Sequence, residues 1–240
     1  MILALETATP RGSVALVCGA AVRAEVFLLP GPRASGSYLS AVEALFTAAG
    51  AATGDVSAVA VSAGPGAFTG LRVGMSAAKG FCFGWGVPLV PVPTLPALAQ
   101  RFPGEGRIVC PVQDARRGEV YAALFRWNGG ELARLSPDMA IAPTLLPGRI
   151  PDGDVLFCGD GVTPFGAMFR EALGDRAILV SGDEGLPRAS AVGIVGERIF
   201  RDGGAVDPRT AVPFYLRSSG AEPAPPRPYR GDPFRDGPVL

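Results

Sequence analysis

The sequence has 240 residues, 48% of them hydrophobic and 18% charged, and its 22 basic and 22 acidic side chains balance to a formal net charge of zero. That balance argues against a chain that binds nucleic acid or an anionic membrane unaided, because both need a basic surface. The complete absence of histidine excludes Ser-His-Asp triads and imidazole metal ligands.

The first half of the chain alternates short apolar runs with two longer helical patterns. Apolar runs bounded by turn residues predict strands, and apolar residues at helical spacing predict helices. In chain order, we expect strands at 2–5, 13–17 and 22–29, a helix at 37–49, a strand at 56–62, a helix rich in small residues that ends near Gly84, a strand at 88–92 and a short helix at 95–102.

The second half repeats this order. In chain order, we expect a strand at 107–113 that ends at Asp114, a turn at 115–118, strands at 119–127 and 131–141, a strand and glycine turn at 154–161, a helix at 165–173, a strand at 177–180 and a helix at 189–202.

Each half opens with a similar hairpin, "LALETATPRGSVAL" and "CPVQDARRGEVYAAL". Both consist of an apolar strand, an acid, a short basic turn that ends in glycine, and a second apolar strand. We interpret them as a weak internal duplication, which predicts an α/β fold of two related lobes, each with a mixed β-sheet flanked by helices. The lobes are expected at residues 1–104 and 105–217, with the last helix packing back on the first lobe. The Pro/Arg-rich residues 218–240 are interpreted as a disordered tail.

Four cysteines stand singly in apolar segments and form no CxxC pair, which excludes zinc ribbons and thioredoxin-like motifs. The N-terminus lacks the basic region of a signal peptide, and no run approaches the roughly 20 apolar residues of a membrane span. We therefore expect reduced thiols, a cytoplasmic location and no membrane contact.

The acids of the two hairpins are candidates for chemistry. If the hairpins face each other across a cleft, the turn N–H groups and the hydroxyls of Thr7, Thr9 and Ser13 would meet phosphates, and Glu6 and Asp114 would hold a hydrated cation. The alternative is that these acids only accept hydrogen bonds from their own turns. The spacing of the residues slightly favours that alternative.

The stretch "SAGPGAFTGLRVGMSAAKG", residues 62–80, joins a strand to a helix through a glycine-rich turn. It lacks the lysine of a phosphate-binding loop, since Leu71 follows Gly70, and Thr69 is a candidate helix cap. Gly70, Gly74 and Ala78 recur every fourth position and form a thin helix face that permits close approach of another element. From spacing alone, that element is either the chain's own core or another subunit.

Four stretches carry a resemblance to a known family, the TsaB (YeaZ) family of tRNA threonylcarbamoyladenosine (t6A) biosynthesis. They are "ILALETATPRGSVAL", "SAGPGAFTGLRVGMSAAKGFCFGWGVPLVPVPTL", "DARRGEVYAALF" and "AVPFYLR", in the family's order. The resemblance implies an actin-like (ASKHA) fold and a subunit that is not an enzyme on its own but belongs to the tRNA N6-adenosine threonylcarbamoyltransferase complex. The catalytic relative TsaD carries a metal-binding histidine pair where Thr94 and Leu98 stand in this sequence.

The resemblance also implies partners and their surface. The partners are a TsaD-like catalytic subunit and a TsaE-like ATPase, and tRNA is met only through the complex. Whether the chain alone is a homodimer or a monomer stays open. The implied interface lies on the helix around residues 37–49 and the helix after the glycine motif, at Leu39, Val42, Phe46, Gly70, Leu71, Val73, Gly74, Ala77 and Ala78. The resemblance implies that no cofactor is required. Weak binding of ATP or ADP with magnesium at the hairpin residues Glu6, Thr7, Thr9, Ser13 and Asp114 stays open. Glu6 stands where the family usually has Asp, which weakens that option.

The alternative function is an independent ASKHA-type phosphotransferase that uses ATP and magnesium at Glu6 and Asp114, with Asp160 in the glycine turn of the second half as a further candidate. The nucleotide-binding glycine motif of such enzymes fits "FCGDGVTPFG" only loosely.

Overall fold

A computed structural model describes residues 1–28, 34–104 and 106–216, so the predicted tail of residues 218–240 lies outside the described residues. The chain divides into two compact units. Unit 1 combines Met1–Ala97 with Pro187–Tyr215, and unit 2 is formed by Leu98–Leu186. Within the described ranges, every helix is too short or too polar to cross a lipid bilayer.

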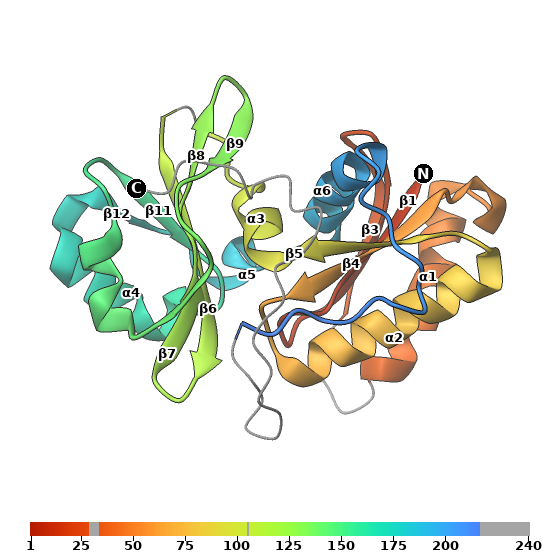
Figure 1. Cartoon of the computed structure of the whole chain (residues 1–240), viewed down its shortest axis with the longest axis horizontal. Helices are drawn as coiled ribbons and strands as arrows, with labels where there is room; N and C mark the ends of the chain where they lie inside the picture. The colour runs from red at the N-terminus through yellow and green to blue at the C-terminus, as the bar shows by residue number, and fades with distance from the viewer. Residues whose placement is uncertain (29–33, 105, 217–240) are drawn as a thin grey trace. The chain divides into compact units, whose positions relative to one another are not determined.

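Unit 1 is a five-stranded sheet in the order β3-β2-β1-β4-β5 with helices on both faces (Figure 1). Its elements are β1 (Ile2–Glu6), β2 (Ser13–Cys18), β3 (Ala21–Phe27), α1 (Ala34–Ala49), a 3-10 turn (Thr53–Asp55), β4 (Ala58–Gly64), α2 (Phe68–Trp85), β5 (Leu89–Pro93) and α6 (Ala189–Arg201), with α3 (Thr94–Ala99) running from unit 1 into unit 2.

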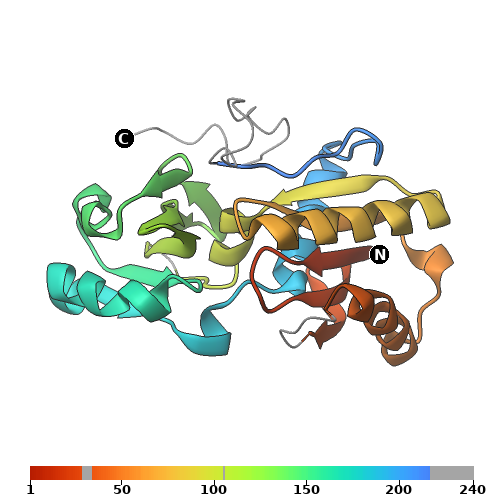
Figure 2. The same cartoon turned by 90° about the horizontal axis from the view of Figure 1, so that it is seen from below.

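The side chains of the central strands alternate between two helical layers. α1 and α2 cover one face of the sheet and α6 covers the other (Figures 1 and 2). The register pairs Leu3 with Leu16 and Val59, and all three side chains pack in the core under α1 and α2. Neighbouring residues point to the opposite face because side chains alternate along a strand, so Ala4 lies against α6. The strands are therefore apolar on both faces, as expected for a sheet covered on both sides.

Unit 2 contains a seven-stranded sheet in the order β10-β7-β6-β11-β12, with β8 paired to β6 and β9 paired to β8. Its elements are β6 (Ile108–Arg116), β7 (Glu119–Ala122), β8 (Phe125–Asn128), β9 (Glu131–Arg134), β10 (Met139–Ile141), 3-10 turns (Pro143–Leu145, Pro147–Arg149), β11 (Val155–Cys158), α4 (Val162–Leu173), a 3-10 turn (Gly174–Arg176), β12 (Ala177–Leu179) and α5 (Gly182–Gly185).

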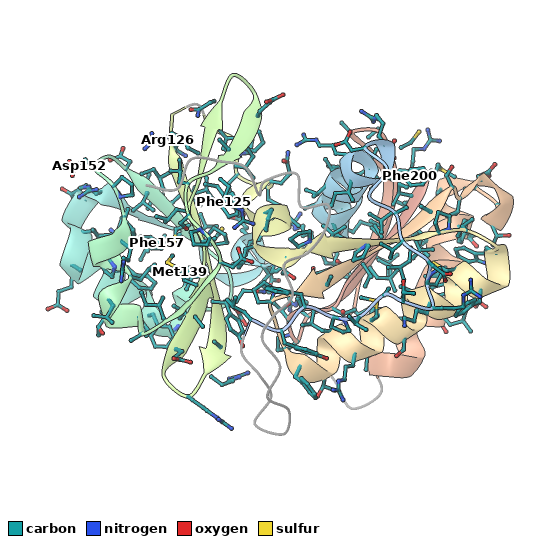
Figure 3. The ribbon with its side chains drawn as sticks, in the orientation of Figure 1. Phe125, Arg126, Met139, Asp152, Phe157 and Phe200 are labelled. Atoms are coloured by element: carbon teal, nitrogen blue, oxygen red, sulfur yellow. The ribbon has the colours of Figure 1, made fainter. Side chains whose placement is uncertain are left out.

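Phe157 lies at the centre of the unit 2 core. Its ring stacks on Phe169 of α4 with centroids 4.6 Å apart, and Met139 packs against the same cluster (Figure 3). Phe125 of β8 is also fully buried. The seven strands therefore have their own core, separate from that of unit 1.

The two sheets share one topology. β1 pairs antiparallel with β2 and parallel with β4, and β4 pairs parallel with β5. In unit 2, β6 pairs antiparallel with β7 and parallel with β11, and β11 pairs parallel with β12. The outer strands β3 and β10 occupy equivalent edges. This correspondence confirms the predicted α/β fold of two related mixed sheets.

Two predicted strands of the second half are each divided in the structure. The run 119–127 separates into β7 and β8, and the run 131–141 into β9 and β10. The backbone N–H of Leu124 donates to the Ser136 hydroxyl at 2.9 Å, and the Leu124 carbonyl accepts the N–H of Leu135 at 2.7 Å. The residues at the two breaks are therefore hydrogen-bonded to each other. β7 pairs with β10, whereas β8 pairs with β9. Apolar periodicity does not reveal such a change of neighbouring strand, so the sequence predicts continuous strands.

Candidate partner surface and hairpin polar sites

The polar residues of the β1–β2 hairpin are buried inside unit 1. Glu6 ends β1 fully buried, and its Oε1 accepts the N–H of Ala8 at 2.6 Å. The N–H of Thr7 donates to the Ser62 hydroxyl at 3.0 Å, which ties the turn to β4. Burial, reinforced by the negative charge of Glu6, raises the pKa of Tyr38 of α1 to about 12. Glu6 therefore lies in a packed environment, although its charge is felt by a neighbouring phenol.

The hydroxyls of Ser13 and Thr9 stabilise the fold by hydrogen bonds. The Ser13 Oγ accepts the N–H of Ala189 at 2.8 Å, which fixes the start of α6 to β2. The Thr9 hydroxyl donates to the Arg11 carbonyl at 3.1 Å across the turn. The hydroxyl oxygen of Thr7 is buried and has no hydrogen-bond partner among the described residues. The structure thus brings the predicted hairpin groups of unit 1 together, in a buried cluster.

The β6–β7 hairpin of unit 2 uses its acid in the same local way. Asp114 Oδ1 accepts the N–H of Arg116 at 2.8 Å, and Oδ2 lies 3.0 Å from the Arg116 guanidinium. Arg116 and Arg117 both have left-handed backbones, with φ of 63° and 55°, which side chains other than glycine rarely adopt. The Asp114 contacts stabilise that strained turn. Asp160 Oδ1 accepts the N–H of Asp114 at 3.1 Å, and burial raises the pKa of Asp160, with the charge of Asp114 acting in the same direction.

Glu6 and Asp114 belong to different units, and each carboxylate accepts an N–H two residues further along its own turn. This is the hydrogen bonding expected of acids that stabilise turns. In the described part of the chain, no three His, Cys, Asp or Glu side chains come close enough to hold a metal ion. Binding of nucleotide and magnesium at these hairpins stays a prediction.

The glycine motif, residues 64–70, packs against the β1–β2 turn. The N–H of Ala67, at the start of the helix, donates to the Ala8 carbonyl at 2.7 Å. Ala67 is the N-cap residue and no side chain caps the helix, so the prediction of Thr69 as the cap is wrong. Thr69 lies within the first turn because α2 begins at Phe68, one residue before it. The helix start is thus occupied by the chain's own turn.

The thin face of α2 packs on Thr7. A Cβ atom at Gly74 would lie 2.6 Å from Thr7 Cγ2 and 2.8 Å from Thr7 Cβ, and one at Gly70 would collide with the Thr7 backbone carbonyl. Real side chains do not approach so closely, so glycine is required here for packing within unit 1. Of the nine predicted interface positions, four are buried within unit 1: Val42, Leu71, Gly74 and Ala78.

The outer surface of α1 and α2 nevertheless carries exposed apolar side chains. Leu39 of α1 is 58% exposed, and Phe83 of α2 is 60% exposed. Between the helices, the Trp85 ring contacts Phe46 and Phe81, with centroids 5.7 and 5.0 Å apart. Phe46, Val73 and Ala77, also predicted at the interface, are partly buried on the same pair of helices. We call the surface formed by Leu39, Phe46, Val73, Ala77 and Phe83 the α1–α2 surface.

Thr94, which stands where TsaD has a histidine, has a structural partner in unit 1. Its fully buried hydroxyl oxygen accepts the N–H of Gly64 at 3.2 Å and so fixes the end of β4. Gly64 itself has φ of 121° and lies against the carbonyl of Phe214, where a side chain would not fit. This position therefore supports the glycine motif.

The structure has a cluster at the start of α2 that the sequence does not predict. Arg72 contacts both Phe68 and Tyr215, and Tyr215 is 143 residues away from Arg72 along the chain. In the sequence, its only sign is the "AVPFYLR" stretch, which contributes to the family resemblance but predicts no contact with α2. Side-chain contacts over such separations leave no periodic trace in a sequence.

Comparisons with known proteins identify what the chain is similar to. A family model described as TsaD, tRNA N6-adenosine threonylcarbamoyltransferase, matches residues 35–224. The tRNA threonylcarbamoyladenosine biosynthesis protein TsaB of Bacillus subtilis (strain 168) is 30% identical over 92% of this chain and 96% of its own length. The TsaB protein of Escherichia coli (strain K12) is 31% identical over the same shares of the two chains.

Solved structures agree with these sequence relatives. YeaZ from Pseudomonas aeruginosa superposes with a TM-score of 0.75 at 28% identity, covering 90% of this chain and 99% of that one. The activator of the 2-hydroxyisocaproyl-CoA dehydratase from Clostridium difficile has a TM-score of 0.51 at 11% identity, over 85% of this chain and 97% of that one. The second likeness concerns the fold alone. The predicted actin-like architecture is thereby confirmed.

Proposed function

This chain belongs to the TsaB (YeaZ) family, whose named members act in tRNA threonylcarbamoyladenosine biosynthesis, and from this premise we propose that it is a non-catalytic scaffold subunit of the t6A complex. In the proposed complex it pairs with a TsaD-like catalytic subunit and helps to recruit a TsaE-like ATPase. It meets tRNA only through the complex, and it needs no cofactor of its own.

The α1–α2 surface is the observation that carries the proposal. Large apolar side chains such as Leu39 and Phe83 are more than half exposed, on two helices whose inner faces already form the unit 1 core. Exposed apolar surface costs free energy in water and is typical of protein interfaces. The Trp85 ring, in contact with Phe46 and Phe81, packs beneath this surface.

The non-catalytic part of the proposal is supported by the hairpin chemistry. The sequence contains no histidine for acid–base work or metal binding. Glu6 is fully buried and bonded to its own turn, and Asp114 is bonded to its own turn and to Arg116. Neither acid is placed as an exposed catalytic base within its unit.

The test is the molar mass by light scattering after gel filtration, for the chain alone and mixed with the TsaD-family protein of the same organism. We expect a stable one-to-one complex. Leu39→Arg combined with Phe83→Arg should abolish it, while Leu145→Arg in unit 2, an equally exposed leucine, should not. A complex that survives the double substitution would refute the role of this surface. If the unsubstituted chain forms no complex, the scaffold role is refuted. The mass of the chain alone decides between monomer and homodimer.

A further inference from the structure

Arg72 on α2 is held in a fixed orientation by two aromatic residues of unit 1. Its guanidinium carbon lies 3.9 Å from the centroid of the Phe68 ring, and its Nε donates to the Tyr215 hydroxyl at 3.0 Å. The two rings are themselves in contact, with centroids 5.1 Å apart. An arginine side chain normally loses considerable rotamer entropy when it binds a ligand, and this clamp removes much of that loss in advance.

Tyr215 is itself anchored. The described end of the chain passes beside α2, as both views show (Figures 1 and 2). The N–H of Phe214 donates to the Ala63 carbonyl at 2.6 Å, and Val206 and Leu89 exchange backbone hydrogen bonds of 2.8 and 3.2 Å. The hydroxyl that accepts from Arg72 therefore sits on a segment fixed to β4 and β5.

The clamp leaves the two terminal nitrogens of Arg72 available. Arg72 is exposed, and no carboxylate of the described residues lies within ion-pair distance of it. A guanidinium with a free pair of terminal nitrogens binds a carboxylate or a phosphate through two parallel hydrogen bonds. The geometry therefore suits an oxyanion that presents two acceptor oxygens side by side.

We propose that Arg72, clamped by Phe68 and Tyr215, is a preformed binding point for an Asp or Glu carboxylate of the partner protein, an inference that rests on the proposed scaffold function. The surroundings favour a protein over RNA. Phe68 is 40% exposed beside Arg72, and interfaces between proteins are enriched in arginine and aromatic residues. The only charged residues of α2 are Arg72 and Lys79, so the helix complements an acidic partner. Two cations are too few for a surface that binds an RNA backbone.

The experiment measures the dissociation constant for the TsaD-family partner by calorimetry, with the full-length chain. Arg72→Gln should weaken binding by about 30-fold, the loss typical of a central interface residue. Arg72→Lys should recover only part of the affinity, because lysine keeps the charge but neither the stacking nor the paired hydrogen bonds. Tyr215→Phe, which removes only the hydroxyl, should weaken binding by roughly 3-fold, consistent with the loss of one exposed hydrogen bond. Arg23→Gln, an exposed arginine on β3, is the control for net charge and should leave affinity unchanged.

The outcomes separate this inference from the function on which it rests. Unchanged affinity of Arg72→Gln, with the complex otherwise intact, would overturn the role of Arg72 and leave the scaffold function standing. Unchanged partner affinity together with weaker tRNA binding by the complex would overturn it in favour of a phosphate contact. If the unsubstituted chain forms no complex, the scaffold function fails and this inference fails with it. Equal melting temperatures of the variants exclude misfolding as the cause of a loss.

Discussion

The packing of α2 on Thr7 predicts opposite effects for two glycine-to-alanine substitutions in one helix. At Gly80, no atom lies within 4 Å of a new Cβ, so alanine should stabilise unit 1 by about 0.8–1 kcal/mol through helix propensity alone. At Gly74, the same gain is opposed by overlap with the Thr7 side chain, and overpacking of this kind typically costs about 1–3 kcal/mol. The two variants should therefore differ by about 1–3 kcal/mol, with Gly74→Ala the less stable.

The assay is urea unfolding followed by tryptophan fluorescence in a Trp127→Phe background. Trp85 of α2 is then the only tryptophan, so the signal reports on unit 1. Thr7→Ala provides a second check, because it removes the atoms nearest to Gly74 and should relieve part of the cost when the two substitutions are combined. If Gly74→Ala and Gly80→Ala are equally stable, α2 does not pack on the hairpin as described, and the account of the glycine motif is refuted.

Two further predictions concern the anchoring of α6 and the acids of unit 2. The Glu25 carboxylate accepts hydrogen bonds from the backbone N–H of Ser190 at 3.0 Å and from the Ser190 hydroxyl at 2.8 Å. Glu25→Ala should therefore lower the free energy of unfolding of unit 1, measured by urea, by about 1.5–3 kcal/mol, whereas Arg23→Ala on the same strand should not. Equal effects of the two substitutions would contradict this prediction. Burial raises the folded pKa of Asp160 above 3.8, so stability is lost as pH rises through that raised value. Asp160→Asn should therefore melt higher than the unsubstituted chain at neutral pH, and the difference should vanish below pH 3.8. A gain independent of pH would show that the charge of Asp160 is not responsible.

The repeated hairpins allowed the fold to be predicted because their signal is local. In each, an acid, a basic turn and a glycine stand between two apolar strands, and the sheets built on them share one strand order. The break at 123–124 could not be predicted, because the apolar pattern continues across it while the outer neighbour changes from β10 beside β7 to β9 beside β8. The break at 135–138 coincides with the turn residues Ser136, Pro137 and Asp138, a signal that the prediction of one continuous strand left out.

The candidate site was less predictable, because its contacts join distant parts of the sequence. Spacing showed that Gly70 and Gly74 share a helix face, but only the structure places Thr7 against that face. The clamp on Arg72 depends likewise on Tyr215, more than a hundred residues later. By contrast, the turn-stabilising alternative for Glu6 and Asp114 could be stated in advance, since it involves only residues two positions apart.

The central claim is that the chain activates a partner without performing chemistry itself. The most direct measurement is the amount of t6A formed on an ANN-decoding tRNA by the TsaD-family and TsaE-family proteins of the same organism, supplied with threonylcarbamoyl-adenylate and ATP. We predict that t6A forms only when this chain is added, and that Asp114→Asn supports the reaction as well as the unsubstituted chain. Formation of t6A at the same rate without the chain, or abolition of the reaction by Asp114→Asn, would contradict the account.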